Sequence, residues 1–338
     1  MLTLVTGATG LVGNNVVRLL VERGEQVRVL VRANSGSGRG AQALEGLPVE
    51  LSIGDVCDAE SVRRACHGAQ RVVHAAAMVQ IGWTGLEAQR AINVGGTRNV
   101  VAAAAAEGAR LLYVSTVNTL GLGDREHPAD EETAGVEPVL CPYVITKREA
   151  ERVVLDAAGS VAAGSVAAGS GLDAVIVNPA YMLGPWDWKP SSGRMLLQIA
   201  GGWAKLAPPG GNDFCDVRDV ATGILSALAR GQRGRRYILS GEYMSFLDAW
   251  RMFARIIGVK PPWFAARRPG LWVYGHAGDL WGKLTGREPE LNSAAVEMAK
   301  LEHHYSYARA AAELDYRPRP ALEAAEAAWA WFLEHRYA

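Results

Sequence analysis

A tyrosine and a lysine stand four residues apart in the stretch CPYVITKREAE, residues 141–151, and both side chains can exchange protons. On a helix, residues at this spacing project from one face, so Tyr143 and Lys147 would lie side by side. A phenol has a pKa of about 10 in model peptides, and a nearby ammonium group lowers it by favouring the phenolate. The pair could therefore act as a general acid and base, with Tyr143 moving the proton. A solvated i,i+4 pair is the alternative, and the pair alone does not decide between the two.

The N-terminal stretch VTGATGLVGNN supplies a context for this pair. Its glycines are spaced three residues apart, between an apolar run at 2–6 and an amphipathic stretch that ends at Gly24. Glycines let backbone N–H groups approach a pyrophosphate, and a helix N-terminus favours negative charge. A glycine-rich turn without a ligand is the alternative, which the flanking strand and helix disfavour. The segment is predicted to bind the phosphates of a dinucleotide through Gly7, Thr9, Gly10, Leu11, Val12 and Gly13.

The end of the second apolar run, residues 26–32, indicates which dinucleotide is bound. An NAD-preferring site usually has an acidic residue there, which holds the ribose 2′-hydroxyl. Here Arg32 occupies that place, and no Asp or Glu follows before Glu45. An arginine can bind a 2′-phosphate bidentately, whereas a carboxylate would repel it. NADP(H) is therefore favoured over NAD(H), with Arg39 as a second candidate contact; a solvated strand-end arginine is the alternative for Arg32.

The elements that position these residues are predicted from the alternation of apolar runs, which indicate strands, and amphipathic stretches, which indicate helices. Strands are predicted at 2–6, 26–32, 49–54, 71–77, 110–116 and 173–179, and helices at 9–24, 58–67, 93–107 and 142–158. Near-continuous apolar strands separated by helices predict a doubly wound α/β (Rossmann) fold, with a parallel sheet covered on both faces. Ligands of such sheets lie beyond the carboxyl ends of the strands. Residues predicted to meet the cofactor at that edge are Asp55, Val56, Ala75, Ala76 and Ala77.

The pattern changes after residue 180, where nine of the ten tryptophans lie. Helices are predicted at 245–257, 292–300 and 320–334. The chain thus divides into a dinucleotide-binding domain at 1–180, which 216–240 rejoins, and a smaller, mostly helical substrate-binding part at 181–338. The repeat AAGSVAAGSVAAGSG at 157–171 is interpreted as a flexible surface loop.

Two further features are better explained by structure than by a separate function. His303 and His304 are adjacent, which suits chelation poorly, so a solvated helix end and no metal site are expected. Arg267 and Arg268 precede PGLWVYGHAGDLWGKL, a stretch that could lie on a membrane surface. Packing over a substrate cleft is favoured instead, because its polar face is not strongly basic.

The overall composition excludes several classes of protein. The 338 residues contain 35 Lys and Arg and 35 Asp and Glu, so the basic surplus of a nucleic-acid-binding protein is missing. The four cysteines form no C-x-x-C pair, which is typical of reduced thiols. The opening residues MLTLVTG already predict a strand, so no leader is expected, and the sequence contains no apolar run long enough to cross a bilayer. A cytoplasmic protein with a small-molecule substrate, no nucleic-acid partner and no integral membrane segment is expected.

Seven motifs occur in one order: TGATGLVG, GDVCD, VVHAAA, INVGGTRNV, YVSTVNTLG, YVITK and NPAYMLGP. In this combination the chain resembles the extended short-chain dehydrogenase/reductase family, of the NAD(P)-dependent epimerase/dehydratase type, over essentially its whole length. The resemblance implies that Tyr143 and Lys147 are catalytic, together with a hydroxyl at the end of the strand at 110–116. Setting Gly121 on the family's glycine puts that hydroxyl at Thr116 and leaves Ser115 as a neighbour with a cofactor or structural role.

The resemblance implies further contacts. Pro179, Ala180 and Met182 would meet the nicotinamide end of the cofactor. Trp186 and Trp188 follow that segment, where the family usually sets substrate specificity. Asn118 is a further candidate substrate contact, with a turn residue as its alternative. The family often forms homodimers, here through the helices at 93–107 and 142–158.

Two functions are compatible with this resemblance. The favoured one is an NADP(H)-dependent reductase of a ketone or aldehyde in an apolar or ring-bearing substrate, similar to the dihydroflavonol-reductase-like branch. The alternative is an NAD-dependent nucleotide-sugar epimerase or dehydratase, because NPAYMLGPWDWKPSSGR and RYILSGEYMS look like hopanoid-associated sugar epimerases. Lys189 and Arg194 would then hold a diphosphate. The intact Tyr-x-x-x-Lys pair argues against a non-catalytic sensor.

Overall fold

A seven-stranded sheet forms the centre of the computed structural model, which describes residues 1–33, 42–135, 138–159, 171–202, 205–266, 268–286 and 288–338. Its strands, in spatial order, are β10 (Arg236–Leu239), β6 (Ala174–Pro179), β5 (Arg110–Val114), β4 (Arg71–His74), β1 (Leu2–Thr6), β2 (Gln26–Val31) and β3 (Glu50–Ile53). Every neighbouring pair runs parallel. The predicted doubly wound α/β fold is confirmed.

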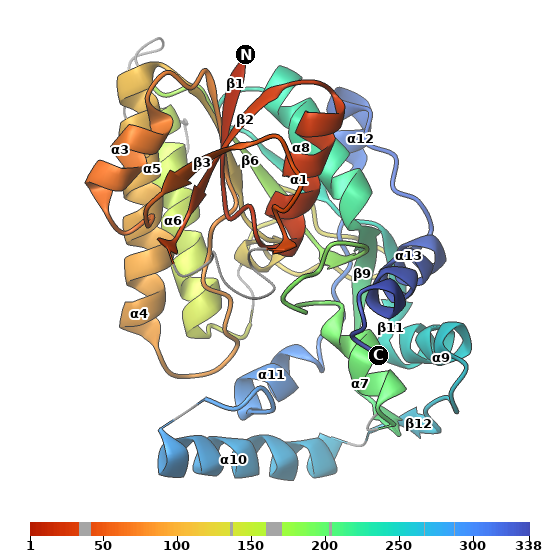
Figure 1. Ribbon diagram of the computed structural model, residues 1–338. Coiled ribbons are helices and arrows are strands. Elements are labelled where there is room, and N and C mark those ends of the chain that lie inside the picture. Colours follow the sequence, from red (N-terminus) through yellow and green to blue (C-terminus); the bar gives the residue numbers. More distant parts are fainter. Residues whose placement is uncertain (34–41, 136–137, 160–170, 203–204, 267, 287) are drawn as a thin grey trace.

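Helices cover both faces of this sheet (Figure 1). One layer consists of α1 (Leu11–Glu22), α8 (Val217–Arg230) and α12 (Ala308–Leu314). The other consists of α3 (Ala59–Cys66), α5 (Gly96–Glu107) and α6 (Pro142–Ala158). The strand order reverses direction between β1 and β4, and in such folds ligands bind in the crevice that this reversal opens.

The predicted helix at 93–107 starts earlier than expected. A short helix α4 (Leu86–Arg90) runs into a π-helical turn η2 (Ala91–Gly95), which continues as α5. π-Helical turns are rare in proteins, and those that occur often lie at functional sites. The helix at 142–158 has the predicted bounds, and most of the Ala-Gly-Ser repeat, residues 160–170, lies outside the described residues.

The C-terminal part is mostly helical, as predicted, but it also contains two small sheets. Its helices are α7 (Arg194–Ala200), α9 (Phe246–Ile257), α10 (Arg268–Thr285), α11 (Ser293–Met298) and α13 (Ala321–Glu334). One sheet has the order β11 (Glu242–Ser245), β9 (Gly211–Asp216), β7 (Tyr181–Leu183), and the other pairs β12 (Phe264–Ala265) with β8 (Leu206–Ala207). Four of these five strands have only two to four residues, too few to leave a periodic pattern in the sequence. No described helix has both the length and the apolar character needed to cross a membrane.

The expectation of a solvated helix end at His303 and His304 is wrong. The two side chains are only 2% and 5% exposed. They lie after the end of α11, in an extended segment that bridges Gly211 and Gly123. The His304 ring stacks on Tyr243, with centroids 3.6 Å apart. The backbone pairing of this segment carries both imidazoles into the interior.

Candidate active site

The turn between β1 and α1 can accept a pyrophosphate. Gly7 has a φ of +73°, and a Cβ there would lie 2.6 Å from the Ala75 carbonyl carbon. A Cβ at Gly13 would lie 2.2 Å from the Gly7 carbonyl oxygen. Helix α1 begins after Gly10 without a side-chain cap or an acidic residue in its first turn, which leaves the N–H groups of Leu11 and Val12 to an external anion. The observed cradle therefore fits a dinucleotide.

The other predicted cofactor contacts lie around the same edge of the sheet. Arg32 directly follows β2 and is exposed, whereas Arg39 lies outside the described residues. Asp55 follows β3 and accepts a hydrogen bond from the Cys57 N–H at 2.9 Å. The remaining candidates are Val56 beside Asp55, Ala75, Ala76 and Ala77 after β4, Pro179 and Ala180 at the end of β6, and Met182 within β7.

Tyr143, Lys147 and Thr116 meet at the carboxyl end of β5. Tyr143 and Lys147 project from one face of α6 and are 9% and 3% exposed. The Thr116 side chain lies close enough to the Tyr143 hydroxyl to favour its charged form. The Lys147 ammonium donates to the Tyr113 hydroxyl and to the Val114 carbonyl oxygen, both at 2.8 Å. The structure thus brings together the three groups that were predicted to be catalytic.

Burial controls the protonation of both side chains on α6. It raises the pKa of Tyr143 to about 12, although the Thr116 side chain opposes this shift. It lowers the pKa of Lys147 to about 7, against the charge of Glu151. The expected lowering of the phenol pKa by Lys147 is not observed, because burial dominates; the ammonium group donates to Tyr113 and Val114. Tyr143 is therefore a protonated phenol at neutral pH, which is the form that donates a proton.

Sequence reasoning missed Glu151, a buried carboxylate one helical turn beyond Lys147. Its Oε2 atom accepts hydrogen bonds from the Ser115 hydroxyl at 2.5 Å, the Thr119 hydroxyl at 2.9 Å and the Asn178 amide at 3.0 Å. Ser115 is thereby turned toward Glu151, while Thr116 faces Tyr143. The i,i+4 spacing in YVITKREAE could have indicated that Glu151 lies on the catalytic face of the helix.

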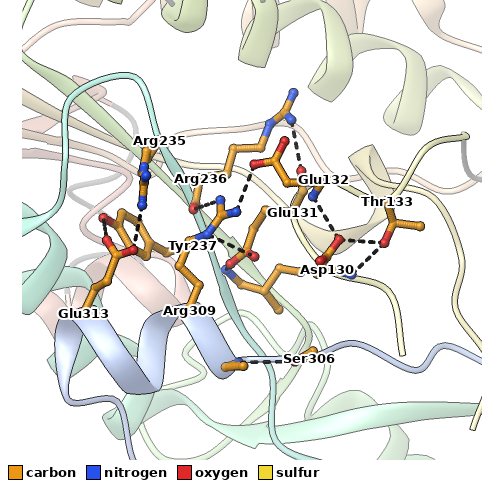
Figure 2. A network of polar contacts seen from close by, with 12 residues as sticks. Asp130, Glu131, Glu132, Thr133, Arg235, Arg236, Tyr237, Ser306, Arg309 and Glu313 are labelled. Carbon is orange, nitrogen blue, oxygen red and sulfur yellow. Dashed lines mark hydrogen bonds and ion pairs between the residues drawn. The ribbon is translucent and has the colours of Figure 1, made fainter. Parts of the chain in front are cut away.

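A polar network ties this carboxylate to the C-terminal part of the chain. Arg236 on β10 donates to Glu151 Oε1 at 2.5 Å. Figure 2 shows how Arg309 on α12 lies between the Arg236 carbonyl oxygen and the carboxylates of Glu131 and Glu132. The loop that contains Glu131 and Glu132 is thereby fixed to both β10 and α12.

Two further buried groups near the site were also missed. His74 contacts the Thr6 hydroxyl at 2.7 Å and the Thr97 hydroxyl at 3.1 Å, and burial lowers its pKa to about 3, so it is neutral. Asn93 lies in the π-helical turn, and its amide donates to the Met78 carbonyl oxygen at 3.0 Å. The motif INVGGTRNV contained Asn93, but nothing in the sequence indicated a π-helical turn.

The candidate substrate residues have different surroundings. Asn118 donates its backbone N–H to the Thr116 hydroxyl at 3.3 Å. The Arg18 guanidinium lies 3.3 Å from the centroid of the Trp186 ring. Trp188 is 7% exposed and packs edge-on against Trp331 in the C-terminal core. A substrate contact of these three residues stays a prediction, and burial gives Trp188 a clear packing role.

Comparison with known proteins agrees with this geometry. The profile of the NAD dependent epimerase/dehydratase family matches residues 3–240. The chain is 34% identical to the "Putative dihydroflavonol 4-reductase" of Synechocystis sp., over 98% of this chain and 95% of that one. It is 36% identical to "Sterol demethylase protein B" of Methylococcus capsulatus, over 78% of this chain and 76% of that one.

A solved structure is similar over nearly the whole chain. The crystal structure of gox2253 superposes with a TM-score of 0.82 at 36% identity, covering 99% of this chain and 98% of that one. The family match includes the glycine loop, the Tyr-Lys helix and the strands between them. The chain therefore belongs to the NAD dependent epimerase/dehydratase family.

Proposed function

We propose that this protein is an NADP(H)-dependent reductase of a ketone or aldehyde in an apolar or ring-bearing small molecule. The arrangement of Thr116, Tyr143 and Lys147 at the same edge of the sheet as the glycine loop carries this proposal. Two relatives, named for a dihydroflavonol and a sterol, support the class of substrate. The proposal includes action in the cytoplasm, as a homodimer.

Each residue has a role in this reaction. A bound nicotinamide cofactor supplies the hydride. The hydroxyls of Thr116 and Tyr143 bind the carbonyl oxygen, and Tyr143 gives it a proton as negative charge develops there. The pKa of about 12 keeps Tyr143 protonated at neutral pH. Lys147 holds the carboxyl end of β5 through Val114, and in its protonated form it brings a positive charge to this end of the strand.

Replacing Tyr143 by phenylalanine tests the assignment of the acid. Tyr143→Phe should bind NADPH as the wild type does, because the ring is retained. It should reduce a panel of apolar, ring-bearing ketones at least about 100-fold more slowly, since general acid catalysis contributes about that much or more. Tyr274→Phe, on the exposed face of α10, is the matched control. Undiminished turnover by Tyr143→Phe would show that another group is the acid.

The preference for NADP(H) depends on Arg32, which is exposed at the end of β2. Arg32→Asp should weaken NADPH binding more than NADH binding, because the new carboxylate repels the 2′-phosphate. Arg23→Asp, at the opposite end of α1, is the control. Fluorescence titration with both cofactors measures the ratio, and an equal loss for both would remove Arg32 from the site.

A nucleotide-sugar epimerase or dehydratase is the alternative, and the name of the matching family favours it. Of the two cations expected to hold the diphosphate, Lys189 and Arg194, only one is available for it. Arg194 is already paired with Glu290 and with the Pro190 carbonyl oxygen, whereas Lys189 is exposed. Release of tightly held NAD(H) from the purified protein, with no reversible binding of NADPH, would favour the epimerase over the reductase.

A further inference from the structure

Helix α10 turns small residues inward and large apolar side chains outward. Gly275 and Gly278 face α11: a Cβ at Gly278 would lie 1.9 Å from the Leu291 carbonyl oxygen, and one at Gly275 would lie 2.9 Å from Ser293 Cα. The outward side chains are more than half exposed: Trp272, Val273, Tyr274, Leu280, Trp281 and Leu284. A helix of a globular protein normally buries its apolar stripe. The exposed stripe of α10 therefore indicates a surface that contacts a partner or a membrane.

The outward face has the composition of a membrane-interface helix. Val273, Ala277, Leu280 and Leu284 follow one another at helical spacing and form an aliphatic stripe. Aromatic side chains border this stripe. Rings that are apolar but carry one polar atom favour the boundary between lipid headgroups and acyl chains. Such a helix lies along a membrane surface with its apolar side in the lipid.

A second segment adds exposed apolar side chains at the same end of the molecule. Trp263 and Phe264 are 69% and 52% exposed, and β12, which contains Phe264, leads into α10 within a few residues. Phe264 pairs with Leu206 of β8, which is 43% exposed. Figure 1 shows β12 and α10 next to each other, at the end away from the seven-stranded sheet. The apolar surface thus extends beyond one helix.

Three exposed lysines lie at this end of the molecule. Lys205, Lys260 and Lys283 are exposed and form no ion pair within the described part of the chain. Two neighbouring carboxylates accept hydrogen bonds from backbone groups: Asp279 from the Ser293 N–H at 3.0 Å, and Glu288 from the Trp83 N–H at 3.3 Å. Lysines around an apolar face complement anionic lipid headgroups.

The exposed apolar side of α10 points away from Tyr143 and the reaction site. Ala294 on α11 packs in one cluster with Tyr143, and α10 contacts the other side of α11 (Figure 1). The sequence-based preference, in which residues 269–284 pack over a substrate cleft, stays a prediction that this arrangement does not favour. We propose that α10 and β12 form a surface, here called the α10 face, that binds a membrane containing anionic lipid. This inference goes beyond the proposed reductase and does not depend on it.

Vesicle flotation with the full chain tests the α10 face. The wild type should float with vesicles of phosphatidylcholine and phosphatidylglycerol, less with phosphatidylcholine alone, and less as salt is added. The double variant Trp281→Glu with Leu284→Glu should lose at least about ten-fold in vesicle affinity, because two apolar anchors become charged. Leu322→Glu, an equally simple change of an exposed leucine on α13, should bind as the wild type does. Circular dichroism checks that all variants fold.

Three results would overturn the proposal. One is a wild type that does not float with anionic vesicles. Another is an equal loss of flotation in Leu322→Glu. The third is a wild-type oligomer that dissociates in the α10 variants without lipid, since the α10 face would then be covered by a second copy of this chain.

Discussion

At the scale of single residues, the buried charge of Glu151 connects the catalytic helix to the sheet. Its carboxylate accepts hydrogen bonds from donors on four segments, and its charge opposes the fall in the pKa of Lys147. A carboxylate that satisfies so many donors is costly to neutralise in a buried place. Glu151 is thus a positioning residue, which acts on the reaction through Lys147 and through the ends of β5 and β6.

Glu151→Gln should therefore shift the pH dependence of the enzyme. Without the carboxylate charge, the pKa of Lys147 should fall further below its present value of about 7. The alkaline decline of kcat/KM for NADPH, which reports on groups of the cofactor-free protein, should then move to lower pH. Glu149→Gln is the control, because Glu149 is on the same helix but pairs with Arg90. An unshifted profile with only lower stability would give Glu151 a purely structural role.

A second buried carboxyl group, that of Asp213, should affect the stability of the protein. Burial raises the pKa of Asp213 from 3.8 to about 7, so the folded chain binds this proton more tightly than the unfolded chain. Between these two pH values, the free energy of unfolding should fall as pH rises, with a slope from this group of up to about 1.4 kcal/mol per pH unit. Asp213→Asn cannot ionise and keeps an acceptor for the Tyr305 N–H, so this part of the decline should vanish.

Urea unfolding between about pH 4 and 8 measures this difference. The variant and the wild type should converge at the acid end and separate as the pH rises. Glu326→Gln, an exposed change on α13, should follow the wild-type curve. Parallel curves for Asp213→Asn and the wild type would contradict the raised pKa.

At the scale of elements, the glycine loop has two positions that look alike in sequence but differ in space. A Cβ at Gly13 would lie 2.2 Å from the Gly7 carbonyl oxygen, whereas one at Gly10 would lie 3.4 Å from it. Gly13→Ala should lower the free energy of unfolding by about 1–3 kcal/mol, because backbone must move. Gly10→Ala should cost less than about 1 kcal/mol, mainly through the helix cap. Denaturant unfolding compares the two, and equal costs would contradict the close approach.

The sequence could predict those elements whose patterns are local. Buried parallel strands are near-continuous apolar runs, and α6 begins with a proline and ends before a glycine, so their bounds were close to the observed ones. Helix α10 was harder, because its apolar residues face outward and its contact with α11 depends on glycines. His303 and His304 were misplaced because their burial depends on pairing with residues far away in the chain. The same limit hid the bonds that Ser115 and Asn178 make to Glu151.

At the scale of the whole molecule, the predicted homodimer would use a surface distinct from the α10 face. Ala102, Ala105 and Ala106 of α5 are exposed on the outer side of the layer formed by α3, α5 and α6. Small side chains allow two helices to approach closely, and in a two-fold dimer the same patch meets its own copy. Arg152 and Asp156 of α6 pair with each other at 2.7 Å and give the neighbouring surface a polar rim.

Ala105→Arg should convert this dimer into a monomer, because a bulky cation would be placed against itself near the two-fold axis. Light scattering after size exclusion, at several protein concentrations, measures the mass. Ala312→Arg is the matched control, since Ala312 is exposed on α12, on the opposite face of the sheet. The control should keep the mass of two chains, and Ala105→Arg should still float with anionic vesicles through the α10 face. A wild type with the mass of one chain at every concentration would eliminate the dimer, while loss of flotation in Ala105→Arg would show that membrane binding needs both copies.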